Sequence, residues 1–233
     1  MRRELFVAAF EQRLSSRLRI VLAVGVNFVA AFGLGDGFPF GYFAPVLTAY
    51  IVSAGVLGKE FSSGTPQLTF ARPVQRVDYV LARWLACVAA MLAFNVVAVV
   101  IGAVALHAAH SQGVNFVHLA VAELGGAGAC AVVLGFSALS NGFADIVLVA
   151  ATGVLSFLLQ SGAEMTHDPD RGFALSIIGD LLSRWNFPAV NESGLHYDSV
   201  TVASLALFAA AVATWLLVAV LAVRRREITY ATD

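Results

Sequence analysis

The strongest constraint on the fold is a set of long apolar stretches, which occupy residues 20–34, 40–57, 80–106, 117–139, 143–160 and 200–223. A helix needs about 20 mainly apolar residues to cross a bilayer, because the hydrocarbon layer is about 30 Å thick and each residue adds about 1.5 Å. The 233-residue chain is 12% charged, whereas soluble domains are about 25% charged. The sequence therefore excludes a soluble fold. It predicts a single all-α, polytopic membrane domain over residues 1–233 with six transmembrane helices.

Two further segments are amphipathic. In residues 1–19, Phe6, Phe10 and Leu14 recur every four residues among arginines, which predicts a helix lying in the membrane interface; a frayed basic tail is the alternative. Residues 161–199 contain Ile177 and Ile178 in a helical apolar pattern that continues to residue 185. This pattern predicts an extracytoplasmic segment with an amphipathic helix at the outer surface. Residues 140–142 read Ser-Asn-Gly, so we expect a tight turn between the fourth and fifth spans.

Orientation follows from the distribution of basic residues, since short loops rich in Lys and Arg stay on the cytoplasmic side. All 14 basic residues except Arg171 and Arg184 lie in three segments. These are the N-terminus, the connection between the second and third spans, and the C-terminal flank of the sixth span. With six spans, the three segments share one side. We therefore expect a multi-pass protein of the cytoplasmic (inner) membrane with both termini in the cytoplasm.

The connection at residues 58–79 has the features of a built structure. Gly64 allows a sharp turn, Thr65-Pro66 is a suitable N-cap and first helical residue, and Arg72-Pro73 can end one helix and open the next. The sequence predicts a short cytoplasmic helix that leads directly into the third span. An inert turn with snorkelling arginines is the alternative.

This connection resembles that of the permease subunits of type-2 ATP-binding-cassette (ABC-2) transporters. Those proteins have a Glu, a Gly-Thr and an Arg-Pro followed by another Arg between their second and third spans. The matching positions here are Glu60, Gly64, Thr65, Arg72, Pro73 and Arg76. The basic N-terminal helix, the six spans and the long outer segment also agree with this family. The resemblance implies a coupling helix that docks on an ATPase subunit, a second permease copy or paralogue, and usually export of a substrate.

The chain has no phosphate-binding loop of the form G-x-x-x-x-G-K-[ST]. Its one lysine, Lys59, follows Gly58 but precedes Glu60. We therefore expect a transport subunit that is not itself an enzyme and holds no cofactor, with ATP and Mg²⁺ bound by the partner ATPase. We expect the lipid bilayer as a further partner and no nucleic acid.

Polar residues inside the spans have structural and functional interpretations. In the structural interpretation Glu123 is a snorkelling or hydrogen-bonded carboxylate, and in the functional interpretation it contacts the substrate. Asn27 and Asn95 are interpreted as interhelical hydrogen-bonding groups. Cys87 and Cys130 lie in apolar runs, where a thiol is usually a small core residue. The fourth span is rich in small residues, which favours close helix packing or a dimer seam: Gly125, Gly126, Gly128 and Gly135.

Other functions remain open at this point. An ion-coupled secondary transporter would normally show several buried ionisable groups or broken helices related by repeats. An intramembrane enzyme would need paired catalytic groups on its spans. A permease-like subunit serving metal or haem maturation is a third alternative, because all histidines map to the outer side. They are His107, His110, His118, His167 and His196.

Overall fold

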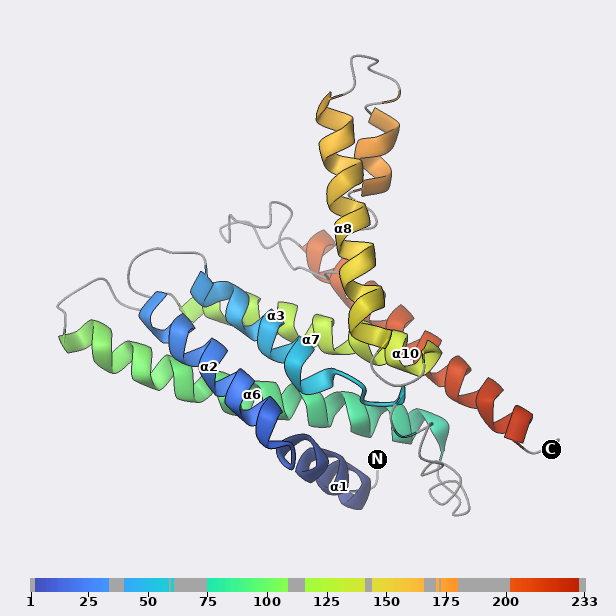
Figure 1. Cartoon of the computed structure of the whole chain (residues 1–233), viewed down its shortest axis with the longest axis horizontal. Coiled ribbons are helices and arrows are strands. Elements are labelled where there is room, and N and C mark those ends of the chain that lie inside the picture. Colours follow the sequence, from blue (N-terminus) through green and yellow to red (C-terminus); the bar gives the residue numbers. More distant parts are fainter. Residues whose placement is uncertain are drawn as a thin grey trace.

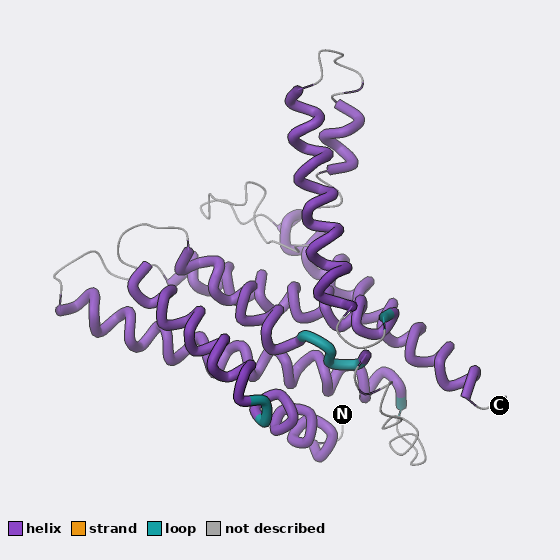
Figure 2. The backbone as a smooth tube through the Cα atoms, viewed as in Figure 1, coloured by secondary structure: helices purple, strands orange, loops and turns teal. Residues whose placement is uncertain are grey.

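The computed structural model describes residues 3–33, 40–58, 60, 75–108, 116–140, 144–165, 171, 173–179 and 202–230. These residues are almost all helical and include no strand (Figure 2). The all-α prediction is therefore confirmed for this part of the chain. The labelled helices of Figure 1 are α1 (Arg3–Leu14), α2 (Arg17–Gly33), α3 (Phe40–Ser53), α6 (Arg76–Ala108), α7 (Phe116–Leu139), α8 (Ala144–Met165) and α10 (Val202–Tyr230).

The predicted N-terminal helix is present. In α1 the rings of Phe6 and Phe10 stack with centroids 6.1 Å apart, as residues four apart on a helix can. A bend of 77° separates Arg3–Leu14 from Arg17–Ala31, and α1 packs along α6. The helix is confirmed, whereas its position in the membrane interface stays a prediction.

Helix α7 lies at the centre of the bundle, with contacts to α3, α6, α8 and α10. Two glycines allow this close packing. A Cβ on Gly126 would overlap Met91 Sδ and lie 3.0 Å from the carbonyl oxygen of Pro45 in α3, and a Cβ on Gly135 would overlap the Trp215 ring of α10. The packing interpretation of these two small residues is confirmed. Cys87 and Cys130 are also buried in the core as free thiols.

Within the described part of the chain, three helices are long and apolar enough to cross a membrane: Arg76–Gly102, Leu119–Leu139 and Val202–Arg225. The bent pair Arg3–Leu14 and Arg17–Ala31 would make a fourth if it forms one span. These helices give the chain the character of a membrane protein. The prediction of six spans is thus shown only in part.

Helix α3 ends earlier than the apolar stretch 40–57 predicts. It has 14 residues, a length of about 21 Å, which is short of the hydrocarbon layer. Its end at Ser53 is followed by a turn in which Gly55 has a φ of 63°. This left-handed conformation is accessible to glycine and stops the helix.

Other helix bounds also differ from the sequence prediction. Helix α6 begins at Arg76 rather than residue 80, and α10 continues past residue 223 to Tyr230. The separation of α7 from α8 is as predicted, and Ser140 N donates to Phe136 O over 2.8 Å where α7 ends. Helix α8 then points away from the other helices (Figure 1). Residues 173–179 are helical, in agreement with the amphipathic prediction, and residues 180–199 lie outside the described part.

Candidate functional site

The structure describes two of the six predicted coupling residues. Glu60 is buried, with 3% of its surface exposed, and Arg76 is exposed at the first position of α6. Gly64, Thr65, Arg72 and Pro73 lie outside the described residues. The short helix predicted for the connection therefore stays a prediction, whereas the surroundings of Glu60 are defined.

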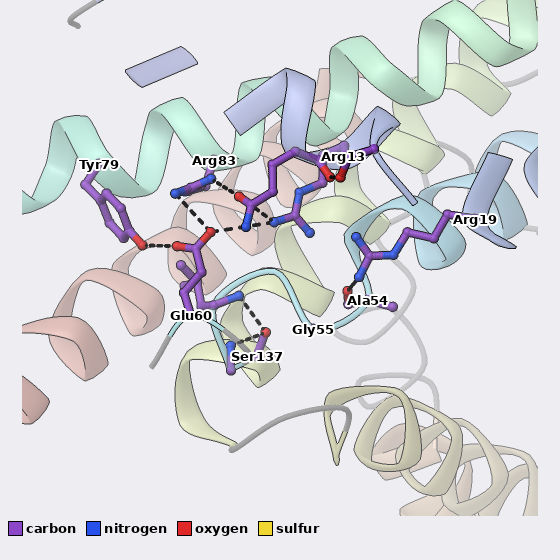
Figure 3. Close-up of polar contacts among 12 residues, drawn as sticks. Arg13, Arg19, Ala54, Gly55, Glu60, Tyr79, Arg83 and Ser137 are labelled. Carbon is purple, nitrogen blue, oxygen red and sulfur yellow. Dashed lines mark hydrogen bonds and ion pairs between the residues drawn. The ribbon is translucent and has the colours of Figure 1, made fainter. Parts of the chain in front are cut away.

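Glu60 lies at the centre of a polar cluster that joins α1 to α6 (Figure 3). Its Oε1 is 2.9 Å from Arg83 Nη2 and 3.7 Å from Arg13 Nη2. The hydroxyl of Tyr79 donates a hydrogen bond to its Oε2. Arg13 comes from α1, and Tyr79 and Arg83 lie four residues apart on α6, so that both side chains reach the same carboxylate.

Gln12 completes this group, which we call the Glu60 cluster: Gln12, Arg13, Glu60, Tyr79 and Arg83. Gln12 Oε1 accepts hydrogen bonds from Arg83 Nη1 over 2.6 Å and from Arg13 Nη2 over 3.3 Å. The Arg83 guanidinium also lies over the Tyr79 ring, 5.3 Å from its centroid, within range of a cation–π interaction. Glu60 is thereby tied to both helices at several atoms.

The electrostatics of the cluster depend on burial. Arg13 is only 3% exposed, and its Nε and Nη1 have no hydrogen-bond acceptor among the described residues. One carboxylate thus lies between two guanidinium groups at a largely buried site, where charges are screened less than at the surface. Removing one partner of such a group leaves an uncompensated buried charge. The arrangement can hold the chain at residue 60 against α1 and α6.

The turn between α3 and Glu60 is held by a second set of contacts, partly visible in Figure 3. Arg19 Nη2 donates to Ala54 O over 2.7 Å, and Gly55 N donates to Asp145 Oδ2 over 2.6 Å. The amides of Leu57 and Gly58 both donate to Ser137 Oγ, over 2.9 and 3.0 Å. We call the last two bonds the Ser137 latch. Residues 54–58 are consequently fixed to α2, α7 and α8, whereas Glu60 is fixed to α1 and α6.

Sequence reasoning missed several of these side chains. The sequence indicates Arg13 and Arg83 only as basic residues that flank the spans. It assigns no role to Tyr79, Ser137 or Asp145. The one local signal is the spacing of Tyr79 and Arg83, which places both on one face of α6. The pairing with Glu60 depends on the tertiary arrangement of α1 and α6 and has no local signature.

The intramembrane polar residues behave as interhelical hydrogen-bonding groups. Asn27 Nδ2 of α2 donates to Thr48 Oγ1 of α3, and Asn95 Nδ2 of α6 donates to Glu123 Oε2 of α7, each over 2.9 Å. The structural interpretation of Asn27 and Asn95 is therefore confirmed, and Glu123 is hydrogen-bonded. The five histidine side chains lie outside the described residues, so a metal role stays untested.

Comparison with known proteins does not assign this chain to a family. No protein-family model matches the sequence, and no curated protein matches it either. Functional inference therefore rests on the residues and contacts above.

Proposed function

We propose that this chain is the membrane-spanning permease subunit of an ATP-binding-cassette transporter of the ABC-2 type, driven by a separate ATPase subunit. In this proposal it has six spans, lies in the cytoplasmic membrane with both termini inside, and pairs with a second permease copy or a paralogue. The assembled complex hydrolyses ATP with Mg²⁺ bound by the ATPase. The transport direction proposed is export, because the family resemblance implies it.

The observation that supports this proposal most strongly is the burial of Glu60 near the start of the connection at residues 58–79. Glu60 is the first residue of the ABC-2-like pattern, and it contacts Arg13 of α1 and Arg83 of α6. A force applied to the following residues by an ATPase would reach both helices through these contacts. Glu60 therefore acts as a positioning residue rather than as a surface that touches the ATPase.

Arg76 has a different part in the proposal. It is exposed at the start of α6, only one helical turn before Tyr79, and α6 is long enough to cross the membrane. An ATPase contact at Arg76 would act directly on this helix. Docking and transmission are thus assigned to different residues, Arg76 and Glu60 respectively.

The proposal is tested by assaying ATP hydrolysis in two preparations of the tagged chain. The chain purified alone, under conditions that strip bound proteins, should hydrolyse no ATP because its sequence has no phosphate-binding loop. The complex isolated from native membranes in mild detergent should hydrolyse ATP, and its ATPase subunit should be identifiable by mass spectrometry. Robust hydrolysis by the stripped, uncontaminated chain would overturn the proposed division of labour.

A further inference from the structure

A pocket lies among α2, α3, α6 and α7, away from the Glu60 cluster. Its volume is about 230 Å³ including the part open to the surroundings. Three polar side chains line it, namely Asn27, Asn95 and Glu123, while the other lining side chains are apolar. Only a small part of this volume is wide enough to admit a water-sized particle, with room for about one. Such a polar site inside a helical membrane bundle is a functional suspect.

Two oxygens in this pocket lack hydrogen-bond donors. Asn27 Nδ2 donates to Ala23 O and to Thr48 Oγ1, both over 2.9 Å. Because a backbone carbonyl only accepts, this pairing fixes the amide orientation of Asn27. Its Oδ1 then has no donor among the described residues, and neither has Asn95 Oδ1. Both side chains are deeply buried, with 4% and 3% of their surfaces exposed.

The chemistry of the pocket calls for a positively charged or donating ligand. A buried acceptor without a partner is unfavourable, and a bound water or ion is a usual explanation of such groups. Here the residues that carry these two amide oxygens line the same pocket as Glu123. Carboxylate and amide oxygens are the ligands preferred by hard cations.

We propose that this pocket binds a small monovalent cation of the size of Na⁺ through Asn27 Oδ1, Asn95 Oδ1 and the Glu123 carboxylate. One carboxylate balances one positive charge, whereas a divalent ion would leave a net positive charge in an apolar surrounding. Organic ammonium or guanidinium groups are larger than the free space. Bound cation would bridge α2, α6 and α7, and through the Asn27–Thr48 bond it would also stabilise α3.

This inference goes beyond the proposed function and does not depend on an ATPase. Asn27, Asn95 and Glu123 are absent from the Glu60 cluster and from the connection at residues 58–79. Cation binding and ATPase coupling can therefore be tested separately, and failure of one leaves the other unaffected.

The test measures binding of ²²Na⁺ and thermal unfolding of the purified full-length chain in detergent. At saturating NaCl, Tm should exceed that in choline chloride of equal ionic strength by about 3 °C or more, because a ligand bound only to the folded state stabilises it. About one ²²Na⁺ should bind per chain. LiCl, KCl and CaCl₂ should each raise Tm less than NaCl does, because Li⁺ is smaller than Na⁺, K⁺ is larger and Ca²⁺ is doubly charged.

Variants locate the site. Glu123→Gln keeps the size and a hydrogen-bond acceptor but removes the charge, so both the bound ²²Na⁺ and the Na⁺-dependent shift in Tm should be lost. Asn27→Ala should weaken binding, and Thr214→Ala should leave it unchanged, because that hydroxyl bonds only Ala210 O of its own helix. Absence of bound ²²Na⁺ in the unmodified chain, with equal Tm in all salts, would show that the pocket holds water only. Na⁺ binding that survives in Glu123→Gln would place the site elsewhere and also overturn the proposal.

Discussion

At the scale of single residues, Glu60 is a buried carboxylate that forms ion pairs with two arginines, Arg13 and Arg83. Salt bridges on a surface contribute little to stability. A buried group behaves differently, because the loss of one partner leaves the others unpaired in a poorly solvated place.

Replacing Glu60 with Gln should lower the free energy of unfolding by about 3 kcal/mol, since Arg13 and Arg83 lose their counter-charge. Tyr79→Phe removes the hydrogen bond to Glu60 but no charge, and should cost about 1 to 2 kcal/mol. Thermal unfolding in detergent measures both effects. Glu11→Gln is the matched control, because Glu11 is exposed on the same helix as Arg13. Equal Tm values for Glu60→Gln and Glu11→Gln would contradict the geometry of the Glu60 cluster.

Gly126 gives a second test at this scale. Gly126→Ala places a Cβ against Met91 and the Pro45 carbonyl, and overpacking of this kind costs about 1 to 3 kcal/mol. Gly25→Ala is the control, because a Cβ at Gly25 meets nothing within 4 Å; it should be neutral or stabilising, as alanine favours helix. The Tm of Gly126→Ala should fall below that of the unmodified chain, whereas the Tm of Gly25→Ala should equal or exceed it. A stable Gly126→Ala variant would show that α3, α6 and α7 are packed less closely.

At the scale of elements, the helices follow from the sequence because each contains a long run of apolar residues. The fourth stretch, 117–139, matches α7 within one residue at its start. The end of α3 does not follow, because apolar residues continue to Leu57 and carry no stop signal apart from Gly55. That turn is fixed by contacts with Asp145 and Ser137, about 80 to 90 positions further along the chain. Pairings of such range depend on how the helices pack and cannot be predicted from local patterns.

The Ser137 latch can be tested directly. Ser137→Ala leaves the buried amides of Leu57 and Gly58 without their acceptor, and each unsatisfied group costs about 1 to 3 kcal/mol. Hydrogen exchange at residues 54–58 should become faster, together with a lower Tm. Thr214→Ala, which removes a hydroxyl bonded within its own helix, should change neither. Unaltered exchange at these amides in Ser137→Ala would contradict the latch.

At the scale of the whole molecule, the number of spans and their direction are the least constrained features. Three described helices can cross a membrane, or four with the bent pair, while the basic residues favour six spans. The candidate site could also be predicted only in part. Glu60 stood out by its place in a pattern, but its partners came from helices far apart in sequence, and Gly64, Thr65, Arg72 and Pro73 lie outside the described residues.

Topology is tested with single cysteines in a chain whose Cys87 and Cys130 are replaced by alanine. Cysteines at Ser63 and Ala231 should be shielded from impermeant thiol reagents in intact cells, because both positions adjoin basic segments, which favour the cytoplasmic side. A cysteine at Ser193 should be labelled. These three positions lie outside the described residues, so labelling is the direct source of their location. Labelling at Ser63 with protection at Ser193 would reverse the orientation.

The central claim is that a separate ATPase drives this chain through the connection at residues 58–79. The most direct measurement is the amount of ATPase that copurifies with the tagged chain from native membranes, normalised to the abundance of the chain. The unmodified chain should retain an ATP-binding-cassette ATPase in a fixed ratio. Arg76→Ala and Gly64→Val should lose most of it while inserting normally, because one removes an exposed charge and the other restricts the backbone at a turn. Absence of such an ATPase from the unmodified chain, or full retention by both variants, would contradict the account.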